Sequence, residues 1–353
     1  MIRYLSQKEK KRTRAMYETN FPEDSGEFVD YYYRERIKDN KILVMEEAKL
    51  LEVMLHLNPY QFHFYGEPVL ANYIVAVATD ASVRRQGKMA MVMKQALLDM
   101  AKEHQPFTFL IPANPEVYRS SGFVFVPGEI YTAYEKQLEK PAIQEKRQTG
   151  ERSFKERQLR DPQDIRAAEL SEGAEGQRDS DPGEEPGERM EGFYFQKAMP
   201  IDYPDMAEFA NRLLAKEYDL YPERTASYYE RMEKEMGCQG GGLVLMKRAG
   251  VLAGIFSYGE DDGKAELQEI LVEQEYRENF VGIAEQYFGG ITISKMDYMM
   301  RILNLRALGE LLRSEEPLSM KVRVKDDIIH ENSGTFEIRS DRNSGSIVPI
   351  RPE

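Results

Sequence analysis

The clearest chemical feature of this chain is a short basic turn that contains a glycine. The stretch Arg84–Lys88 places three cations around Gly87, after an apolar strand pattern and before a helical pattern over 89–104. The first amides of a helix lack partners and bind anions, and a glycine lets a phosphate approach the backbone closely. Cations at a helix start oppose the helix dipole unless an anionic ligand balances them. The turn therefore predicts an anion site, and a basic turn without a ligand is the alternative.

The spacing in this turn excludes two common phosphate motifs. It lacks the Gly-x-x-x-x-Gly-Lys-Ser/Thr of a Walker loop and the Gly-x-Gly-x-x-Gly of a dinucleotide-binding turn. It resembles the pyrophosphate loop of the GNAT acetyltransferases, Arg/Gln-x-x-Gly-x-Gly/Ala, with Met in place of the last small residue. The resemblance implies that acetyl-CoA is the co-substrate. Its pyrophosphate would be held by Arg84, Arg85, Gln86, Gly87, Lys88, Met89 and Ala90.

The flanking segments extend the resemblance. The strand before the turn, at 73–78, would pair its end with the pantetheine arm through the backbone of Val77, Ala78 and Thr79. In the family this strand separates from its neighbour, and a β-bulge is a common way to do so. Asn114 would hold the same arm; its alternative is a helix N-cap, and both roles can hold together.

Tyr118 is the candidate general acid. It stands in the Tyr-x-x-x-Gly-Phe context that the family uses for its acid-bearing segment. A phenol of pKa about 10 can protonate a thiolate of pKa about 8.5 when both are close together in a water-poor site. Packing of the ring into a surface groove is the alternative.

The stretches 28–33 and 55–60 resemble one branch of the family, the enhanced intracellular survival (Eis) acetyltransferases. That resemblance implies two GNAT-like domains followed by a sterol-carrier-protein-like domain. It also implies a small polycationic acceptor (aminoglycoside-, polyamine- or lysine-like) and a homo-oligomer such as a hexamer. In this branch the C-terminal carboxylate is the base. We do not carry that role to Glu353, because the last domain looks short, and water or Glu52 stays open.

The pattern of elements predicts an α/β (α+β) fold in tandem mixed sheets flanked by helices. The first GNAT domain is expected at 1–138. Residues 139–192 are acidic, rich in Gly and Pro and poor in aromatics, as in a solvated linker. A second GNAT-like domain at 193–290 has no comparable basic glycine loop, so we expect it to bind no cofactor. Residues 291–353 are expected to form a partial sterol-carrier-like domain.

Composition narrows the function classes. The net charge of -13 argues against general nucleic-acid binding and would attract cationic small molecules. No apolar run is long enough for a membrane span. The four His show no metal-site spacing, so we expect no metal. The lone Cys238 excludes an internal disulfide, and together with the absence of a signal peptide it predicts a cytoplasmic protein.

Two functions follow from these observations. The first is an acetyl-CoA-dependent N-acetyltransferase that modifies a primary amine through a tetrahedral intermediate. The second is a non-catalytic acetyl-CoA sensor or a scaffold for an apolar ligand. The intact basic turn together with Tyr118 favours the enzyme, because a scaffold would need neither.

Overall fold

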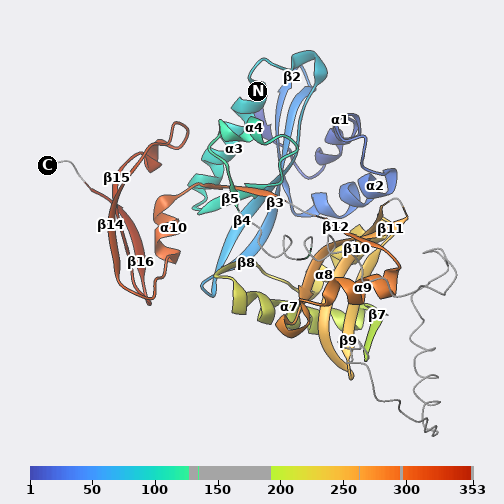
Figure 1. Ribbon diagram of the computed structural model, residues 1–353. Helices are drawn as coiled ribbons and strands as arrows, with labels where there is room; N and C mark the ends of the chain where they lie inside the picture. The colour runs from blue at the N-terminus through green and yellow to red at the C-terminus, as the bar shows by residue number, and fades with distance from the viewer. Residues whose placement is uncertain (127–133, 135–191, 262, 295–296, 351–353) are drawn as a thin grey trace, which may run out of the picture. The chain divides into compact units, whose positions relative to one another are not determined.

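The computed structural model describes residues 1–126, 134, 192–261, 263–294 and 297–350 (Figure 1). The chain divides into two compact units. The first is built from Met1–Gly128, Leu214–Glu223 and Met296–Glu353, and the second from Glu129–Leu213 and Arg224–Lys295. The segment predicted as an acidic linker, 139–192, lies outside the described residues except for Gly192, and that interpretation stays a prediction.

Within the described residues, the first unit is framed by a mixed sheet of eight strands. Seven lie in the order β1-β2-β3-β4-β5-β13-β6, and β8 pairs with β3. Neighbouring strands are antiparallel except β4 and β5, which are parallel. The strands are Ile2–Tyr4 (β1), Lys41–Glu47 (β2), Leu50–Phe64 (β3), Glu67–Thr79 (β4), Phe107–Leu110 (β5), Val124–Val126 (β6), Leu220–Pro222 (β8) and Tyr298–Ile302 (β13). The predicted α/β class, with helices flanking mixed sheets, is confirmed.

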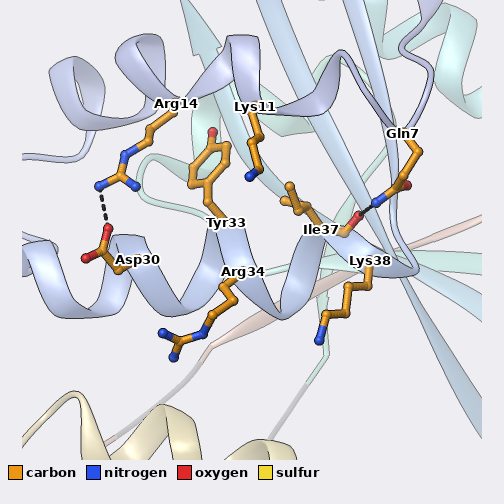
Figure 2. A pocket seen from close by; sticks show the side chains of 8 residues that line it. All are labelled: Gln7, Lys11, Arg14, Asp30, Tyr33, Arg34, Ile37 and Lys38. Carbon is orange, nitrogen blue, oxygen red and sulfur yellow. Dashed lines mark hydrogen bonds and ion pairs between the residues drawn. The ribbon is translucent and has the colours of Figure 1, made fainter.

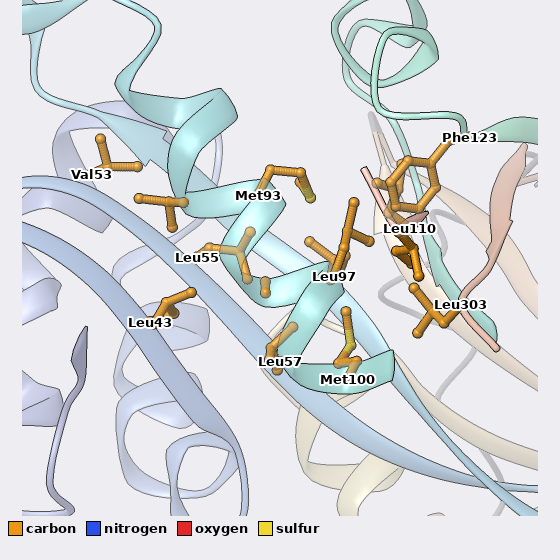
Figure 3. Close-up of a cluster of buried hydrophobic side chains, with 14 of the residues drawn as sticks. Leu43, Val53, Leu55, Leu57, Met93, Leu97, Met100, Leu110, Phe123 and Leu303 are labelled. Atoms are coloured by element: carbon orange, nitrogen blue, oxygen red, sulfur yellow. The ribbon is translucent and has the colours of Figure 1, made fainter. Parts of the chain in front are cut away.

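Helix α3, Lys88–Lys102, packs against one face of this sheet (Figure 3). The contact joins alternate residues of β3 to one stripe of the helix, and all are at most 1% exposed: Val53, Leu55, Leu57, Met93, Leu97 and Met100. Burying a side chain of this size stabilises the fold by about 1.5–3 kcal/mol. The core therefore fixes the start of α3, and with it the basic turn, against the sheet.

The opposite face of the sheet is covered by α1, Arg14–Asn20, and α2, Gly26–Arg34 (Figure 1). The consecutive tyrosines Tyr31–Tyr33 of α2 are buried. The sequence predicts one helix over 21–38, but α2 begins only at Gly26. The reason is Ser25, whose side chain accepts a backbone hydrogen bond at 3.1 Å and caps the helix there.

The second unit contains a sheet of five strands in the order β12-β11-β10-β9-β7, counted over the described residues. The strands are Phe193–Lys197 (β7), Gly242–Arg248 (β9), Val251–Asp261 (β10), Lys264–Val272 (β11) and Ile291–Ile293 (β12). The second unit also contains the helices Ala226–Gly237 (α8) and Phe280–Phe288 (α9) and most of Tyr203–Glu217 (α7), whose last turn belongs to the first unit. The order β9-β10-β11-turn-α9 repeats the order β2-β3-β4-turn-α3 of the first unit. That the second unit is a second GNAT-like domain stays a prediction.

The stretch predicted as one C-terminal domain, 291–353, is divided among three sheets. Strand β12 pairs with β11, and β13 inserts between β5 and β6. Only the remainder forms a separate layer, in which β14, β15 and β16 make an antiparallel sheet that α10 contacts at Gly309. These elements are Leu305–Leu311 (α10), Leu318–Val324 (β14), Gly334–Ser340 (β15) and Gly345–Pro349 (β16). Alternation in the sequence predicts strands at 321–325 and 334–338, which overlap β14 and β15, but it does not reveal β12 or β16 or the sheet that each strand joins.

None of the helices in the described ranges is long and apolar enough to cross a membrane. Over the same ranges, no group of three or more His, Cys, Asp or Glu is arranged to hold a metal ion.

Candidate functional site

Strand β4, predicted to align the thioester, carries the expected bulge. Its pairing with β3 shifts around Ala76, which has a φ of 51°. On its other side β4 pairs with β5 at one position, Tyr73 opposite Phe109. Beyond that position the described residues offer no strand partner on this side, so an extended ligand could pair with the edge as an added strand. The free edge includes the predicted contact residues Val77, Ala78 and Thr79.

The predicted anion site lies between β4 and α3. Asp80 accepts a hydrogen bond from the backbone of Ser82 at 2.9 Å, which starts the turn. Arg85 and Gly87 both have left-handed conformations, with φ of 61° and 76°. Gly87 is the N-cap of α3 and gives it no side-chain hydrogen bond. The amides of Lys88–Ala90 form no hydrogen bond with any described residue, so this helix start has free donors for an anion.

Two of the three predicted cations are held by the protein. Arg84 donates from Nε to the carbonyl oxygen of Thr79 at 3.1 Å and from Nη2 to Oδ1 of Asn20 at 2.8 Å. Lys88 forms an ion pair with Glu52, with 2.5 Å between Nζ and Oε1. Arg85 is exposed and has no ion pair among the described residues. Backbone amides and Arg85 are therefore the groups available to an anion.

The ion pair with Lys88 also bears on the candidate base. Glu52, which the sequence left open as the base, has its Oε1 occupied by Lys88 Nζ. Glu353, the other candidate, lies outside the described residues.

Tyr118 lies on a short helix, α4, Pro115–Arg119, and Asn114 directly precedes this helix. Asn114 is its N-cap and accepts a hydrogen bond from the backbone N–H of Glu116 at 3.1 Å, which leaves its side-chain amide N–H groups free for a ligand. The ring of Tyr118 lies edge-on to Phe123, with 6.1 Å between centroids. Burial raises the pKa of Tyr118 above its ordinary value. Its hydroxyl makes no hydrogen bond with the described residues, so it can donate to a ligand.

The predicted groups lie at one edge of the sheet. Because β4 and β5 are parallel, the turn after β4 and the helix after β5 both begin at the carboxyl ends of these strands. The single pairing between the strands shows that they part toward that edge. An acyl donor held on β4 would therefore extend between the anion site and α4.

The second unit also has a turn between a strand and a helix, from β11 to α9. Arg277 donates from Nε to the carbonyl oxygen of Val272 at 3.0 Å, just as Arg84 bonds to the end of β4. Asn279, with a φ of -109°, takes the place of the left-handed Gly87. The stretch 273–278 carries three glutamates, which would repel a phosphate. The two turns share the contact from an arginine to the preceding strand, but this one has no glycine at the helix start and carries three glutamates beside its single arginine.

A hollow that the sequence did not predict lies elsewhere in the first unit. It measures about 550 Å³ and opens between the segment 7–14 and α2, as Figure 2 shows. Its lining is basic, but Arg14 is paired with Asp30 at 2.7 Å. It contains none of the predicted site residues, so we do not place the acyl-transfer site there. The lining residues are Gln7, Lys11, Arg14, Asp30, Tyr33, Arg34, Ile37 and Lys38.

Sequence reasoning missed Asn20 and Arg301 as residues that brace the site, and it considered Glu52 only as a base. Asn20 holds Arg84, and Glu52 holds Lys88, across long sequence separations. Arg301 on β13 reaches the loop after Tyr118. No periodicity or motif marks these three residues, because each acts through a contact that only the folded chain creates.

One family model and several solved structures are similar to this chain. Residues 1–126 match the family model of the acetyltransferase (GNAT) domain. A probable N-acyltransferase from Enterococcus faecalis V583 superposes with a TM-score of 0.69 at 12% identity, covering 99% of this chain and 85% of that one. A GCN5-related N-acetyltransferase from Anabaena variabilis gives 0.65 at 14% identity, with 100% and 86% covered. Eis1 from Mycobacterium abscessus gives 0.58 at 11% identity, with 100% and 85% covered.

No curated protein matches the chain in sequence. At these identities the solved structures show a shared fold and nothing more about this protein. The match over 1–126 assigns the first part of the chain to the GNAT acetyltransferases. The predicted enzyme class, a GNAT N-acetyltransferase, is confirmed at that level.

Proposed function

We propose that this protein transfers the acetyl group of acetyl-CoA to a primary amine of a small polycationic acceptor. The observation that carries the proposal is the free helix start at Lys88–Ala90, preceded by left-handed Gly87 and by a strand with an unpaired edge. A phosphate-bearing acyl donor fits both parts at once. Its pyrophosphate would accept hydrogen bonds from the amides of 85–90, and its pantetheine arm would pair with 77–79.

The reaction needs few groups from the protein. The amine nitrogen attacks the thioester carbonyl carbon and forms a tetrahedral intermediate, whose oxyanion a backbone N–H near Val77 can stabilise. The C–S bond then breaks, and Tyr118 protonates the departing thiolate. Because burial raises the pKa of Tyr118, the phenol stays protonated at neutral pH, but it donates well only to a thiolate in the same water-poor place.

Deprotonation of the amine is assigned to water. Glu52 is held in an ion pair with Lys88, and Glu353 lies outside the described residues. A polycationic amine suits this mechanism, because neighbouring ammonium groups lower the pKa of each amine and raise the neutral fraction that can attack.

The likeness to Eis1 and the repeated strand order support the rest of the proposal. The second unit is a GNAT-like copy that binds no cofactor, since its turn has lost the glycine and gained glutamates. The C-terminal layer is a partial sterol-carrier-like domain. The proposal also includes self-association of the chain and a location in the cytoplasm.

The experiment is thiol release from acetyl-CoA with a panel of polyamines, lysine derivatives and aminoglycosides. We expect turnover with at least one amine, and a rate at least about tenfold lower in Tyr118→Phe, the low side of acid–base catalysis. Tyr194→Phe, on β7 of the second unit, is the matched control and should leave the rate unchanged. Equal rates in wild type and Tyr118→Phe would contradict the role of Tyr118.

A non-catalytic sensor is the second candidate, and one observation favours it. Glu52, the carboxylate near the anion site that the sequence left open as the base, is held in an ion pair with Lys88. Binding of acetyl-CoA without turnover on any amine would establish the sensor and exclude the enzyme.

A further inference from the structure

Arg301 is a buried cation that the proposed reaction does not use. It lies on β13 between Met299 and Leu303, which are both 0% exposed, and is itself 8% exposed. Met299 and Leu303 belong to the core cluster that contains Phe123 and against which Tyr118 packs. Alternation along the strand therefore directs Arg301 toward the face of the sheet that carries α4.

A carboxylate fixes the guanidinium in place. Arg301 Nη2 lies 2.7 and 2.9 Å from the two carboxylate oxygens of Asp326. Asp326 also accepts hydrogen bonds from the backbone N–H groups of Ile328 at 2.9 Å and Ile329 at 2.8 Å. The backbone of Arg301 is fixed too, since it pairs with Thr108 of β5. The cation has little freedom to move.

The Nη1 side of the Arg301 guanidinium packs against the loop that follows Tyr118. A Cβ added at Gly122 would lie 1.8 Å from Arg301 Nη1, so only glycine fits beneath it. Gly122 has a φ of 80° and ends the turn after α4. In that turn the backbone N–H groups of Ser121 and Phe123 donate to the carbonyl oxygen of Tyr118, at 2.9 and 3.4 Å. The contact thus reaches the backbone of Tyr118 through one turn of chain.

The stability of the fold does not by itself explain the buried Arg301–Asp326 ion pair or its contact with the turn after α4. A buried ion pair is often no more stable than apolar residues of the same size. The Nε of Arg301 is also buried without a hydrogen-bond partner in the described residues, which an arrangement chosen for stability would avoid. Helix α4 has 5 residues, too few to hold its own orientation in water. An external brace is what such a helix lacks.

We propose that Arg301, locked by Asp326, is a positioning residue for Tyr118. The pair comes from the C-terminal part of the chain and clamps the turn that ends α4, so that the phenol is held toward the leaving thiolate. The chemistry of the first GNAT domain then depends on residues after 296. This inference rests on the proposed function, because it assumes that Tyr118 is the acid.

The test is a double-mutant cycle on thiol release with the best amine of the panel. Arg301→Met should lower kcat at least about tenfold, the scale of a misplaced catalytic group, and leave the KM for acetyl-CoA within about twofold. In the Tyr118→Phe background the same substitution should cost less than about twofold, because the acid it positions is gone. If Arg301→Met does not fold, the same cycle is measured with Arg301→Lys, which keeps the positive charge but lacks the forked guanidinium.

The matched control is Arg224→Met. It breaks an ion pair of similar burial in the second unit, Arg224 with Glu269 at 3.0 Å, and should lower the melting temperature without the loss of kcat. An equal loss of kcat in this control, or additive losses in the cycle, would overturn the inference. If Tyr118→Phe alone keeps full rate, the proposed acid is wrong and the inference falls with it.

Discussion

Gly87→Ala separates the cost of a strained backbone from the loss of the anion site. Gly87 has a φ of 76°, and an added Cβ would have no atom within 4 Å. The substitution therefore causes no clash inside the protein. Its cost to folding is the left-handed conformation of a residue with a side chain, roughly 1–2 kcal/mol. That cost lowers the melting temperature by a few degrees.

The effect on acetyl-CoA is expected to be larger. The new methyl group would occupy the space through which a phosphate approaches the free amides of Lys88–Ala90. A hydrogen bond to a charged group contributes about 1.5–3 kcal/mol. Losing one such bond weakens binding by about 10- to 150-fold, at 1.4 kcal/mol for each factor of ten.

Gly66→Ala is the matched control. Gly66 has a φ of 83°, also has no atom within 4 Å of an added Cβ, and lies in the two-residue turn between β3 and β4. Both variants should lose similar stability, measured by thermal melting. In calorimetric titrations with acetyl-CoA only Gly87→Ala should lose affinity. Equal affinities in the two variants would refute the assignment of the anion site.

Two further predictions concern charge. Glu52→Gln frees Lys88 for the phosphates and should tighten acetyl-CoA binding about twofold to fivefold, the scale of a surface ion pair. Turnover should persist in this variant. A loss of about 100-fold in the rate would instead identify Glu52 as the base. Burial, and then the charge of Lys10, lowers the pKa of His56 to about 3. Below a pH of about 6.5 the unfolded chain therefore takes up a proton that the folded chain does not. As the pH is lowered from about 6.5 to about 3, the free energy of unfolding decreases by up to about 1.4 kcal/mol per pH unit. His56→Gln should flatten that part of a urea-unfolding profile, and an unchanged slope would count against the neutral buried imidazole.

Local chemistry in the sequence was enough to predict the strand, turn and helix around Gly87. Apolar runs and helical spacing determine these elements, and the glycine marks the left-handed residue that joins them. The strand pair of the second unit was predictable for the same reason, whereas its identity as a second GNAT-like copy stays a prediction. The position of α2 was missed by a few residues, because the capping side chain of Ser25 outweighed the apolar pattern before it.

Long-range partners could not be predicted in this way. The sequence of β13 does not show which strands it pairs with. In the structure it lies between β5 and β6 and brings Arg301 to the loop after Tyr118. The basic turn likewise predicted three free cations, whereas Asn20 and Glu52 occupy two of them. Such contacts depend on strand order and register, which a single sequence does not encode as a visible pattern.

The most direct test of the central claim is amide hydrogen exchange with and without acetyl-CoA. The amides of Lys88–Ala90 have no partner among the described residues, so they should exchange rapidly in the free protein. Acetyl-CoA should slow exchange at 85–90 and along the free edge at 77–79, and should leave 273–280 unchanged. Protection at 273–280, or no protection at either turn, would contradict the assignment of acetyl-CoA to the first unit.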